Sequence, residues 1–256
     1  MNLHLTNRTR AKISQDQCHV WSPNHTPSAA SARTSGTYSP VNAFDTIITS
    51  PTMQEERDRT FEFLKQCERI VSFPGRGWKF EERILRESKA QLLCLEAIPD
   101  TYTRSTEKAK ELNKQFPNRL LYLNDNFLNP RHYRGHVIDG FWIDFFSFLV
   151  GEYTLTALQT VKEWAATEFR LVITGKNVIS GRSQKSKENT NTLLNKLNIQ
   201  RTSDPEADLL RIIVEMCTAE DLYPTKGHSC VFPLRPKPSP RPTYMQSCYL
   251  EVTKEL

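Results

Sequence analysis

Short apolar runs alternate with amphipathic segments along the chain from residue 52 onward. The apolar runs are rich in Ile, Val, Leu and Phe, which predicts buried strands. These runs are Arg69–Phe73, Gln91–Glu96, Leu120–Leu123, His136–Phe146 and Phe169–Thr174. Apolar residues at helical spacing predict helices at Thr52–Cys67, Trp78–Lys89, Thr103–Gln115 and Leu155–Thr167.

The C-terminal part of the chain breaks this alternation. A capped helix is predicted at Asp204–Tyr223, and two strand-like runs follow at Ser229–Leu234 and Tyr244–Val252, joined only by a proline-rich segment. Strands that alternate with helices predict right-handed crossovers and a parallel sheet, whereas two strands joined by a short link pair antiparallel. The sequence therefore predicts an α/β fold of three layers, with a doubly wound, mostly parallel seven-stranded sheet closed by a C-terminal antiparallel hairpin.

Residues 1–50 differ in composition from the rest, because they are rich in Asn, Ser, Thr and Pro. Such a segment buries too little apolar surface to offset its chain entropy, so we predict a flexible tail at 1–50 and one domain at 51–256. The tail is also poor in acids, which is typical of a transit peptide. The expected location is therefore the cytoplasm, or an organelle matrix if the tail is a transit peptide.

Cysteine usage and hydropathy narrow the class of protein. The six cysteines form no CxxC pair, which favours a reducing compartment, and no zinc-binding pattern predicts a metal. No run approaches the roughly 18–20 apolar residues that cross a bilayer, so no membrane partner is expected. No feature of the sequence indicates an oligomeric state.

The turn Phe73–Gly77 follows the first strand of the predicted sheet and precedes a helix. Its glycines, Gly75 and Gly77, let backbone N–H groups approach a ligand, and ligands of doubly wound sheets bind beyond the carboxyl ends of the strands. Glu96 ends the next strand about 20 positions after Gly75, the spacing of an acid that binds a ribose hydroxyl. These features predict a nucleotide-like ligand, and the alternative is a plain turn with a surface glutamate.

From about Glu68 to Val252, the order of strands and the closing hairpin make the chain similar to the class I S-adenosylmethionine-dependent methyltransferases. The first motif of that family reads acid-x-Gly-x-Gly-x-Gly, and the matching stretch here is Phe73-Pro-Gly75-Arg-Gly77-Trp-Lys79. Phe73 thus replaces the acid, and Lys79 replaces the third glycine. The resemblance implies S-adenosylmethionine as cofactor, at a site that contains Phe73, Gly75, Gly77, Glu96, Asp125 and Asn126.

The resemblance also implies a role for Asp144, near the end of the fourth predicted strand, where catalytic or substrate-facing residues lie in that family. Asp144 is the one ionisable residue between Phe141 and Val150, so its charge needs an explanation. Either it faces the ligand at the open end of the strand, or it pairs with a buried donor. We expect it to face the site and to be catalytic.

Basic residues gather in two segments that follow predicted strands. The net charge is +5, and residues 175–187 contain four cations but no acid. The proline-rich link of the hairpin is the second such segment. Both should leave from carboxyl ends of strands, which predicts a basic rim suited to phosphate contacts, with a pair of solvated loops as the alternative. The residues expected to bind substrate are Lys176, Arg182, Lys185, Arg235 and Lys237, and the expected partner is DNA or RNA.

Three functions remain open on the sequence. The first is a diverged S-adenosylmethionine-dependent methyltransferase that acts on nucleic acid. The second is a catalytically inactive module of the same fold that binds nucleic acid or a protein partner. The third is a nicotinamide-dependent oxidoreductase, against which the terminal hairpin and the lack of a Tyr or Lys proton relay both count.

Overall fold

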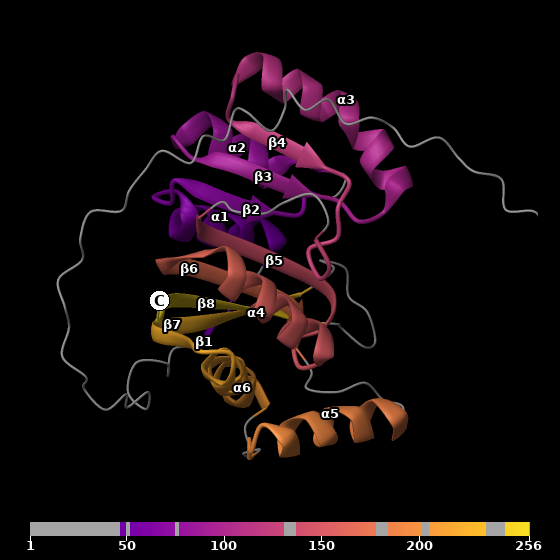
Figure 1. Cartoon of the computed structure of the whole chain (residues 1–256), viewed down its shortest axis with the longest axis vertical. Coiled ribbons are helices and arrows are strands. Elements are labelled where there is room, and N and C mark those ends of the chain that lie inside the picture. The colour runs from indigo at the N-terminus through magenta and orange to yellow at the C-terminus, as the bar shows by residue number, and fades with distance from the viewer. Residues whose placement is uncertain are drawn as a thin grey trace, which may run out of the picture. The chain divides into compact units, whose positions relative to one another are not determined.

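Eight strands form one sheet in the computed structural model of the chain (Figure 1). The structure describes residues 47–49, 52–74, 77–130, 137–177, 184–200, 205–233 and 244–255. The strands are β1 (Ile47–Thr49), β2 (Arg69–Ser72), β3 (Gln91–Leu95), β4 (Leu120–Leu123), β5 (Ile138–Phe148), β6 (Ala165–Lys176), β7 (Leu222–Pro233) and β8 (Tyr244–Lys254). Their order across the sheet is β1-β7-β8-β6-β5-β2-β3-β4.

The pairing of these strands matches the predicted topology. Strands β2 to β6 pair in parallel with one another, whereas β8 runs antiparallel between β6 and β7. The seven strands from β2 to β8 therefore form a mostly parallel sheet that is closed by a C-terminal antiparallel hairpin. This part of the sequence prediction is confirmed.

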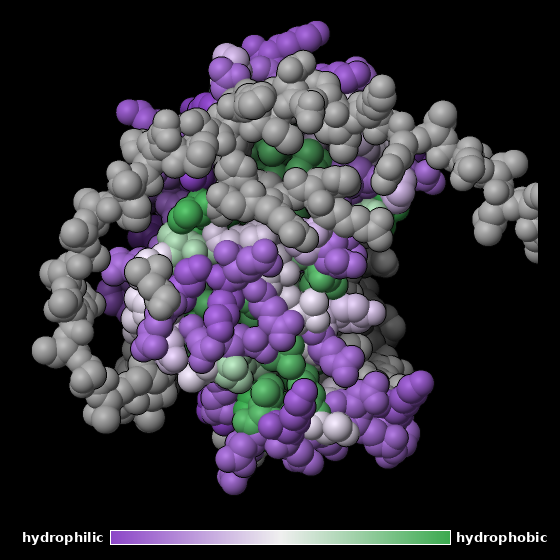
Figure 2. All heavy atoms as spheres, viewed as in Figure 1, coloured by the Kyte–Doolittle hydropathy of each residue, from purple (hydrophilic) through white to green (hydrophobic). Residues whose placement is uncertain are grey.

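Helices cover both faces of the sheet. They are α1 (Met53–Leu64), α2 (Lys79–Glu87), α3 (Pro99–Gln115), α4 (Glu152–Trp164), α5 (Gln184–Lys196) and α6 (Pro205–Ala219). In Figure 1, α4 and α6 lie in front of the sheet, whereas α1 and α2 lie behind it. In the same view, Figure 2 shows hydrophilic residues over α4 and a group of hydrophobic residues over α6. The arrangement gives the three layers that the sequence predicts.

Helix α2 illustrates how the sequence produces this packing. Phe80, Ile84 and Leu85 recur at helical spacing and are buried in the core between α2 and the sheet. Arg83 and Arg86 lie on the other side of the helix and form ion pairs there. The helix is thus amphipathic. Its apolar stripe packs on β2, which precedes it, and on β3, which follows it.

Two elements lie where the sequence predicts none. Helix α5 occupies a segment whose first residues were predicted as a basic loop, and it buries Thr190, Leu193 and Leu194. The three-residue strand β1 pairs parallel with β7, although its residues belong to the segment 1–50 that was predicted as a tail. Residues 1–46 lie outside the described part of the chain. Strand β7 also begins earlier than predicted, at Leu222, so α6 is shorter than the predicted helix.

Gly140 on β5 supplies a test of the packing behind the sheet. A Cβ at this position would lie 2.9 Å from Ile70 Cγ1, 3.0 Å from Cys67 Cβ and 3.1 Å from Cys67 Sγ. We expect Gly140→Ala to lower the free energy of unfolding by about 1–3 kcal/mol, because the added methyl overpacks the core. Urea denaturation measures the change. Gly151→Ala is the matched control, since a Cβ there meets nothing within 4 Å and its φ of 175° is extended. Equal losses in the two variants would contradict this packing.

Candidate functional site

The candidate site lies where adjacent parallel strands end. Strands β6, β5, β2, β3 and β4 are neighbours in that order, so the residues that follow them share one edge of the sheet. The expected site residues Phe73, Glu96, Asp125, Asp144 and Lys176 all lie at this carboxyl edge. The topology therefore brings together residues that are widely separated along the chain.

Contacts between the loops tie this edge together. The Glu96 backbone N–H donates to the Leu123 carbonyl over 3.0 Å, and Asn124 Nδ2 donates to the Glu96 carbonyl over 2.7 Å. The rings of Phe73 and Phe127 meet edge to face with centroids 5.4 Å apart. The loop after β2 thus contacts the loop after β4 across the end of β3.

The turn after β2 differs from the motif of the resembled family in a physically informative way. Phe73, at the position of the acid, is half-buried and packs on Phe127, so the turn itself carries no carboxylate there. A Cβ on Gly77 would meet nothing within 4 Å, which leaves open space beside the backbone at that residue. Gly75 lies outside the described residues.

Trp78 closes the turn and starts α2. Its φ of 50° and ψ of 13° place it in the left-handed region, which bulky residues rarely adopt. Its side chain is 2% exposed, and its ring lies edge to face with that of Tyr122, with centroids 4.9 Å apart. Packing of the indole therefore holds the end of the turn in a conformation that the backbone alone disfavours.

The three expected contacts for the ribose and adenine take part in local hydrogen bonds. Glu96 Oε1 accepts from the Ile98 N–H over 2.9 Å, which steadies the start of α3. Asp125 is buried, and its Oδ1 accepts from the Asn126 N–H over 2.9 Å. Asn126 Oδ1 accepts in turn from the Leu128 N–H over 3.0 Å. These bonds fix the two loops in which the polar side chains are carried.

Asp144 lies past the end of β2, three residues beyond the last pair between the two strands, Val71 with Phe141. It shares a face of β5 with Trp142. The Trp142 ring packs on the ring of Phe80 of α2, with centroids 4.5 Å apart. Among the described residues, Asp144 Oδ1 is buried without a hydrogen-bond partner. Burial raises the pKa of Asp144 to about 6, and the cation of Arg57 on α1 opposes the rise.

A second buried acid, Glu81, stands beside Asp144 and was not predicted from the sequence. It lies in the first turn of α2, is 2% exposed, and has no partner for Oε1 within the described chain. Burial raises the pKa of Glu81 to about 7; a hydrogen bond with Ser72 and the cation of Arg57 oppose the rise, whereas Asp144 adds to it. The signal was present, because Glu81 falls in the same helical stripe as Ile84 and Leu85.

A third acid, Glu56 of α1, completes this buried group. It is 2% exposed, and its Oε1 accepts a hydrogen bond from the Tyr249 hydroxyl over 2.5 Å. Burial raises the pKa of Glu56, and its charge adds to the rise at Asp144. Helix α1 thus covers this part of the sheet with polar as well as apolar side chains.

The expected basic rim is only partly within the described residues. Lys176 ends β6 at the carboxyl edge, and Lys185 is exposed on α5, on a helix and not in the predicted loop. Arg182, Arg235 and Lys237 lie outside the described residues. The segment that carries the last two begins and ends at this edge, because Pro233 of β7 pairs with Tyr244 of β8.

Exposed hydrophobic side chains gather at the same edge. Ile98 follows β3 and is 60% exposed, and Tyr153 at the start of α4 is 66% exposed. Tyr244 is 46% exposed, and its carbonyl accepts from the N–H of Asn177, the residue after Lys176. Tyr244 thus lies next to the strand end that carries Lys176, whereas Ile98 lies farther along the edge, at the end of β3.

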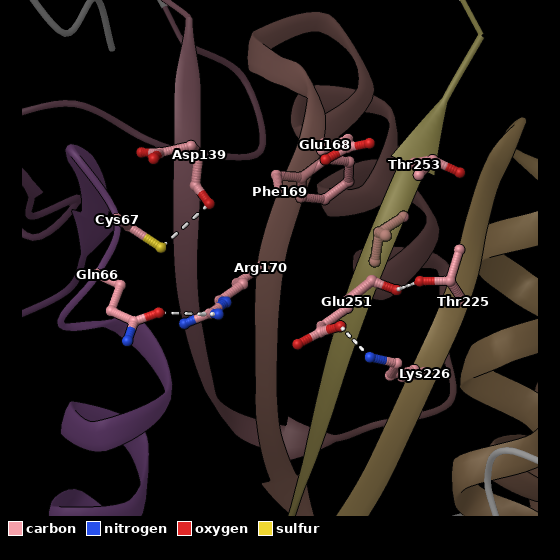
Figure 3. Close-up of a pocket in the computed structure, with 11 residues that line it drawn as sticks. Gln66, Cys67, Asp139, Glu168, Phe169, Arg170, Thr225, Lys226, Glu251 and Thr253 are labelled. Carbon is pink, nitrogen blue, oxygen red and sulfur yellow. Dashed lines mark hydrogen bonds and ion pairs between the residues drawn. The ribbon is translucent and has the colours of Figure 1, made fainter. Parts of the chain in front are cut away.

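A groove of about 550 Å³ opens at the opposite edge of the sheet (Figure 3). Its polar groups contact one another. Arg170 donates to the Phe63 carbonyl over 2.7 Å. It also donates to Gln66 Oε1 over 3.3 Å, and Lys226 Nζ lies 3.6 Å from Glu251 Oε2 (Figure 3). These charges already have protein partners, so the groove is a weaker candidate for a ligand site than the carboxyl edge.

The described residues offer neither a metal site nor a membrane span. They contain no group of three or more His, Cys, Asp or Glu side chains placed to hold a metal ion. No helix among them has the length and apolar character needed to cross a membrane.

Comparisons with known proteins identify the fold. No protein-family model and no curated protein matches the sequence. The chain is similar to M. jannaschii TYW2 in complex with AdoMet, with a TM-score of 0.50 and 11% identity over 79% of this chain and 76% of that chain. It is also similar to geranyl diphosphate methyltransferase in complex with SAM, with a TM-score of 0.50 and 11% identity over 78% of this chain and 85% of that chain. The chain therefore has the class I S-adenosylmethionine-dependent methyltransferase fold, as the sequence resemblance implied.

Proposed function

We propose that this chain is an S-adenosylmethionine-dependent methyltransferase that acts on nucleic acid. The observation that carries the proposal is the set of polar residues at one edge of a class I sheet, with Glu96 after β3, Asp125 after β4 and Asp144 on β5. In sheets of this type, ligands bind at the carboxyl ends of the strands. The fold thus provides a ligand site at this edge, and these residues provide the polar groups that would contact the ligand.

The residues at this edge fit the charge of S-adenosylmethionine. Glu96 has a carboxylate at the spacing of a ribose ligand, and Asp125 and Asn126 stand where adenine contacts are expected. The cofactor is cationic, and three acids of the described chain, Glu56, Glu81 and Asp144, each have a buried carboxyl oxygen without a hydrogen-bond partner that offers negative charge. The departure at Phe73 removes one carboxylate from the turn, but it leaves these acids in place.

Methyl transfer requires the protein to align the reactants, to exclude water and to remove a proton from the acceptor. When bound, S-adenosylmethionine supplies an electrophilic methyl group. A nitrogen or oxygen acceptor loses its proton as it gains the methyl group, and Asp144 is the carboxylate that we assign to take it. The packed rings of Phe73 and Phe127 would exclude water beside the cofactor.

The rim supports nucleic acid as the acceptor. Lys176 and Lys185 provide positive charge for phosphates, and Tyr153 and Tyr244 provide exposed rings on which unpaired bases can stack. Stacking on aromatic side chains and phosphate contacts together are typical of proteins that bind single strands with little sequence preference. We therefore assign a single-stranded or locally unpaired nucleic acid to this edge.

A transfer assay tests the proposal directly. The full chain is incubated with S-adenosylmethionine that carries a labelled methyl group, together with single-stranded RNA, single-stranded DNA, duplex DNA or a protein mixture. We expect label in at least one nucleic acid. Label in protein alone would contradict the assignment of the acceptor, and label in none of them would contradict the proposed activity.

Variants of the rim give a separate prediction for binding of a single strand. We expect Tyr244→Ala to weaken binding by about 5- to 100-fold through lost stacking, and Lys176→Ala to reduce the salt dependence by about one phosphate contact. Fluorescence anisotropy at several salt concentrations measures both. Lys226→Ala is the matched control, because Lys226 is exposed at the opposite edge. Equal effects of Lys176→Ala and Lys226→Ala would contradict a rim at the carboxyl edge.

A further inference from the structure

Glu81 occupies an unusual position for an acid. It lies in the first turn of α2, directly after the turn that joins β2 to this helix, yet only 2% of it is exposed. Acids in the first turn interact favourably with the positive end of the helix dipole and usually face solvent. Glu82 is such an acid, and it forms an ion pair with Arg86. Glu81 instead points into the protein, towards the last residue of β2.

The surroundings of Glu81 leave its charge incompletely balanced. The carboxyl group of Glu81 is hydrogen bonded by its own backbone N–H and by Ser72 of β2, Arg57 of α1 is the cation that acts on it, and Asp144 of β5 is a second acid. Cys94 of β3 also faces it, and its thiol stays protonated because burial raises its pKa. Within the described residues, Glu81 Oε1 has no hydrogen-bond partner. Arg57 therefore acts on both Glu81 and Asp144, and Glu56 adds a third acid to the group.

A buried carboxyl group with one oxygen left unpartnered costs stability unless something offsets it. Acids of this kind persist where a ligand supplies the missing partner or where catalysis needs them. The turn above offers no alternative, because Phe73 replaces the acid of the resembled motif and packs on Phe127. Among the described acids, Glu81 directly follows this turn and Asp144 lies past the end of β2, so their carboxyl groups are placed to meet a cationic ligand there, whereas Glu56 already accepts from Tyr249.

We propose that Glu81 is a cofactor-binding residue whose carboxylate takes up a cationic group of the ligand in place of the acid that is absent at Phe73. The inference rests on the proposed function, which makes that ligand S-adenosylmethionine. Two of its groups are cationic, the ammonium of the amino-acid part and the sulfonium. Both are attracted by a carboxylate in a site from which water is excluded.

A series of three ligands tests the inference by isothermal titration. S-adenosylmethionine carries both cations, S-adenosylhomocysteine carries only the ammonium, and 5′-methylthioadenosine carries neither. We expect Glu81→Gln to weaken S-adenosylmethionine by about 10- to 100-fold and to leave 5′-methylthioadenosine unchanged. If Glu81→Gln weakens S-adenosylhomocysteine by the same factor, Glu81 contacts the ammonium. If the affinity for S-adenosylhomocysteine is unchanged, Glu81 contacts the sulfonium.

Glu82→Gln is the matched control, because it removes the same charge from the next position of the same helix, where the side chain is paired with Arg86. We expect it to change none of the three affinities. Equal weakening of all three ligands by Glu81→Gln would overturn the inference, since the uncharged ligand has no cation to lose. So would unchanged binding of all three, although the proposed function would then stand. Failure of the natural protein to bind any of them would overturn both.

Unfolding without ligand supplies a second readout. The pKa of Glu81 is raised from 4.5 to about 7 in the folded protein, so its contribution to stability is full below pH 4.5 and is lost as the pH rises through about 7. We expect Glu81→Gln to unfold at a higher temperature than the natural protein at pH 8, and the difference to shrink at pH 5. A variant that is less stable at pH 8 would overturn the inference, because Glu81 would then have an adequate partner within the protein.

Discussion

Trp78→Ala is expected to lower the free energy of unfolding by about 3–5 kcal/mol. The indole is 2% exposed and packs edge to face on Tyr122, so its removal leaves a large cavity between α2 and the end of β4. The same change should release the turn that ends at Gly77, because the indole holds the left-handed backbone of residue 78 in place. We therefore expect loss of ligand binding together with loss of stability, measured by urea denaturation and by titration.

Two further variants at this position separate packing from backbone conformation. Trp78→Phe keeps a ring against Tyr122 and should lose less stability than Trp78→Ala. Trp78→Gly removes the ring but suits a φ of 50°, so we expect it to be more stable than Trp78→Ala by about 1 kcal/mol. This order reverses the usual preference of helices for alanine. An unchanged denaturation midpoint in Trp78→Ala would contradict the packing of the indole.

Asp144→Asn is expected to reduce kcat by about 10²- to 10⁴-fold, the range typical of a lost general base, while ligand binding is kept. The pKa of Asp144 is raised to about 6, so the base is protonated below that pH. The rate of the natural protein should therefore rise as the pH passes through about 6 and then level off. In the asparagine variant this rise should disappear, because the titrating group is gone.

Asp139→Asn is the matched control for Asp144→Asn, because Asp139 lies at the start of β5 and Asp144 in its second half. Asp139 accepts hydrogen bonds from the backbone N–H groups of Glu68 and Arg69, so its loss should affect stability and leave the pH profile unchanged. If Asp144→Asn had the same rate as the natural protein, measured with excess ligand, Asp144 would not be the general base.

The sequence was sufficient for the sheet because the signals for it are local. The run at Leu120–Leu123 and the alternation around it predict β4 with its observed bounds. The proline-rich link likewise predicts the hairpin of β7 and β8, since only an antiparallel pair can be joined so briefly. These features depend on the order of residues along the chain and not on distant contacts.

Elements that depend on distant contacts were missed or shortened. β1 has only three residues and exists through its pairing with β7. The start of β7 contains Pro224 and Gly227, which normally interrupt strands, and the sheet accommodates the first of them with a register shift between Pro224 and Lys226. Helix α5 is mostly polar, so its helical periodicity rests on little more than Leu193 and Leu194.

The sequence places Glu96 and Asp144 at one edge of the sheet, but it did not single out Glu81. The positions of Glu96 and Asp144 follow from the ends of predicted strands, which is why the sequence could name them. Glu81 lies in the helical stripe of Ile84 and Leu85, but the depth of its burial arises only when α1 and β5 close over α2. The buried charge at this site is therefore a property of the tertiary structure.

Titration of the full chain with S-adenosylmethionine and with S-adenosylhomocysteine tests the central claim most directly. We predict that both ligands bind to one site per chain, and that Glu96→Ala weakens both because the ribose loses its carboxylate partner. Equilibrium dialysis with labelled ligand would detect binding that releases too little heat for the titration to show. Absence of binding by either ligand would contradict the methyltransferase account, and it would leave a module that keeps this fold without the cofactor.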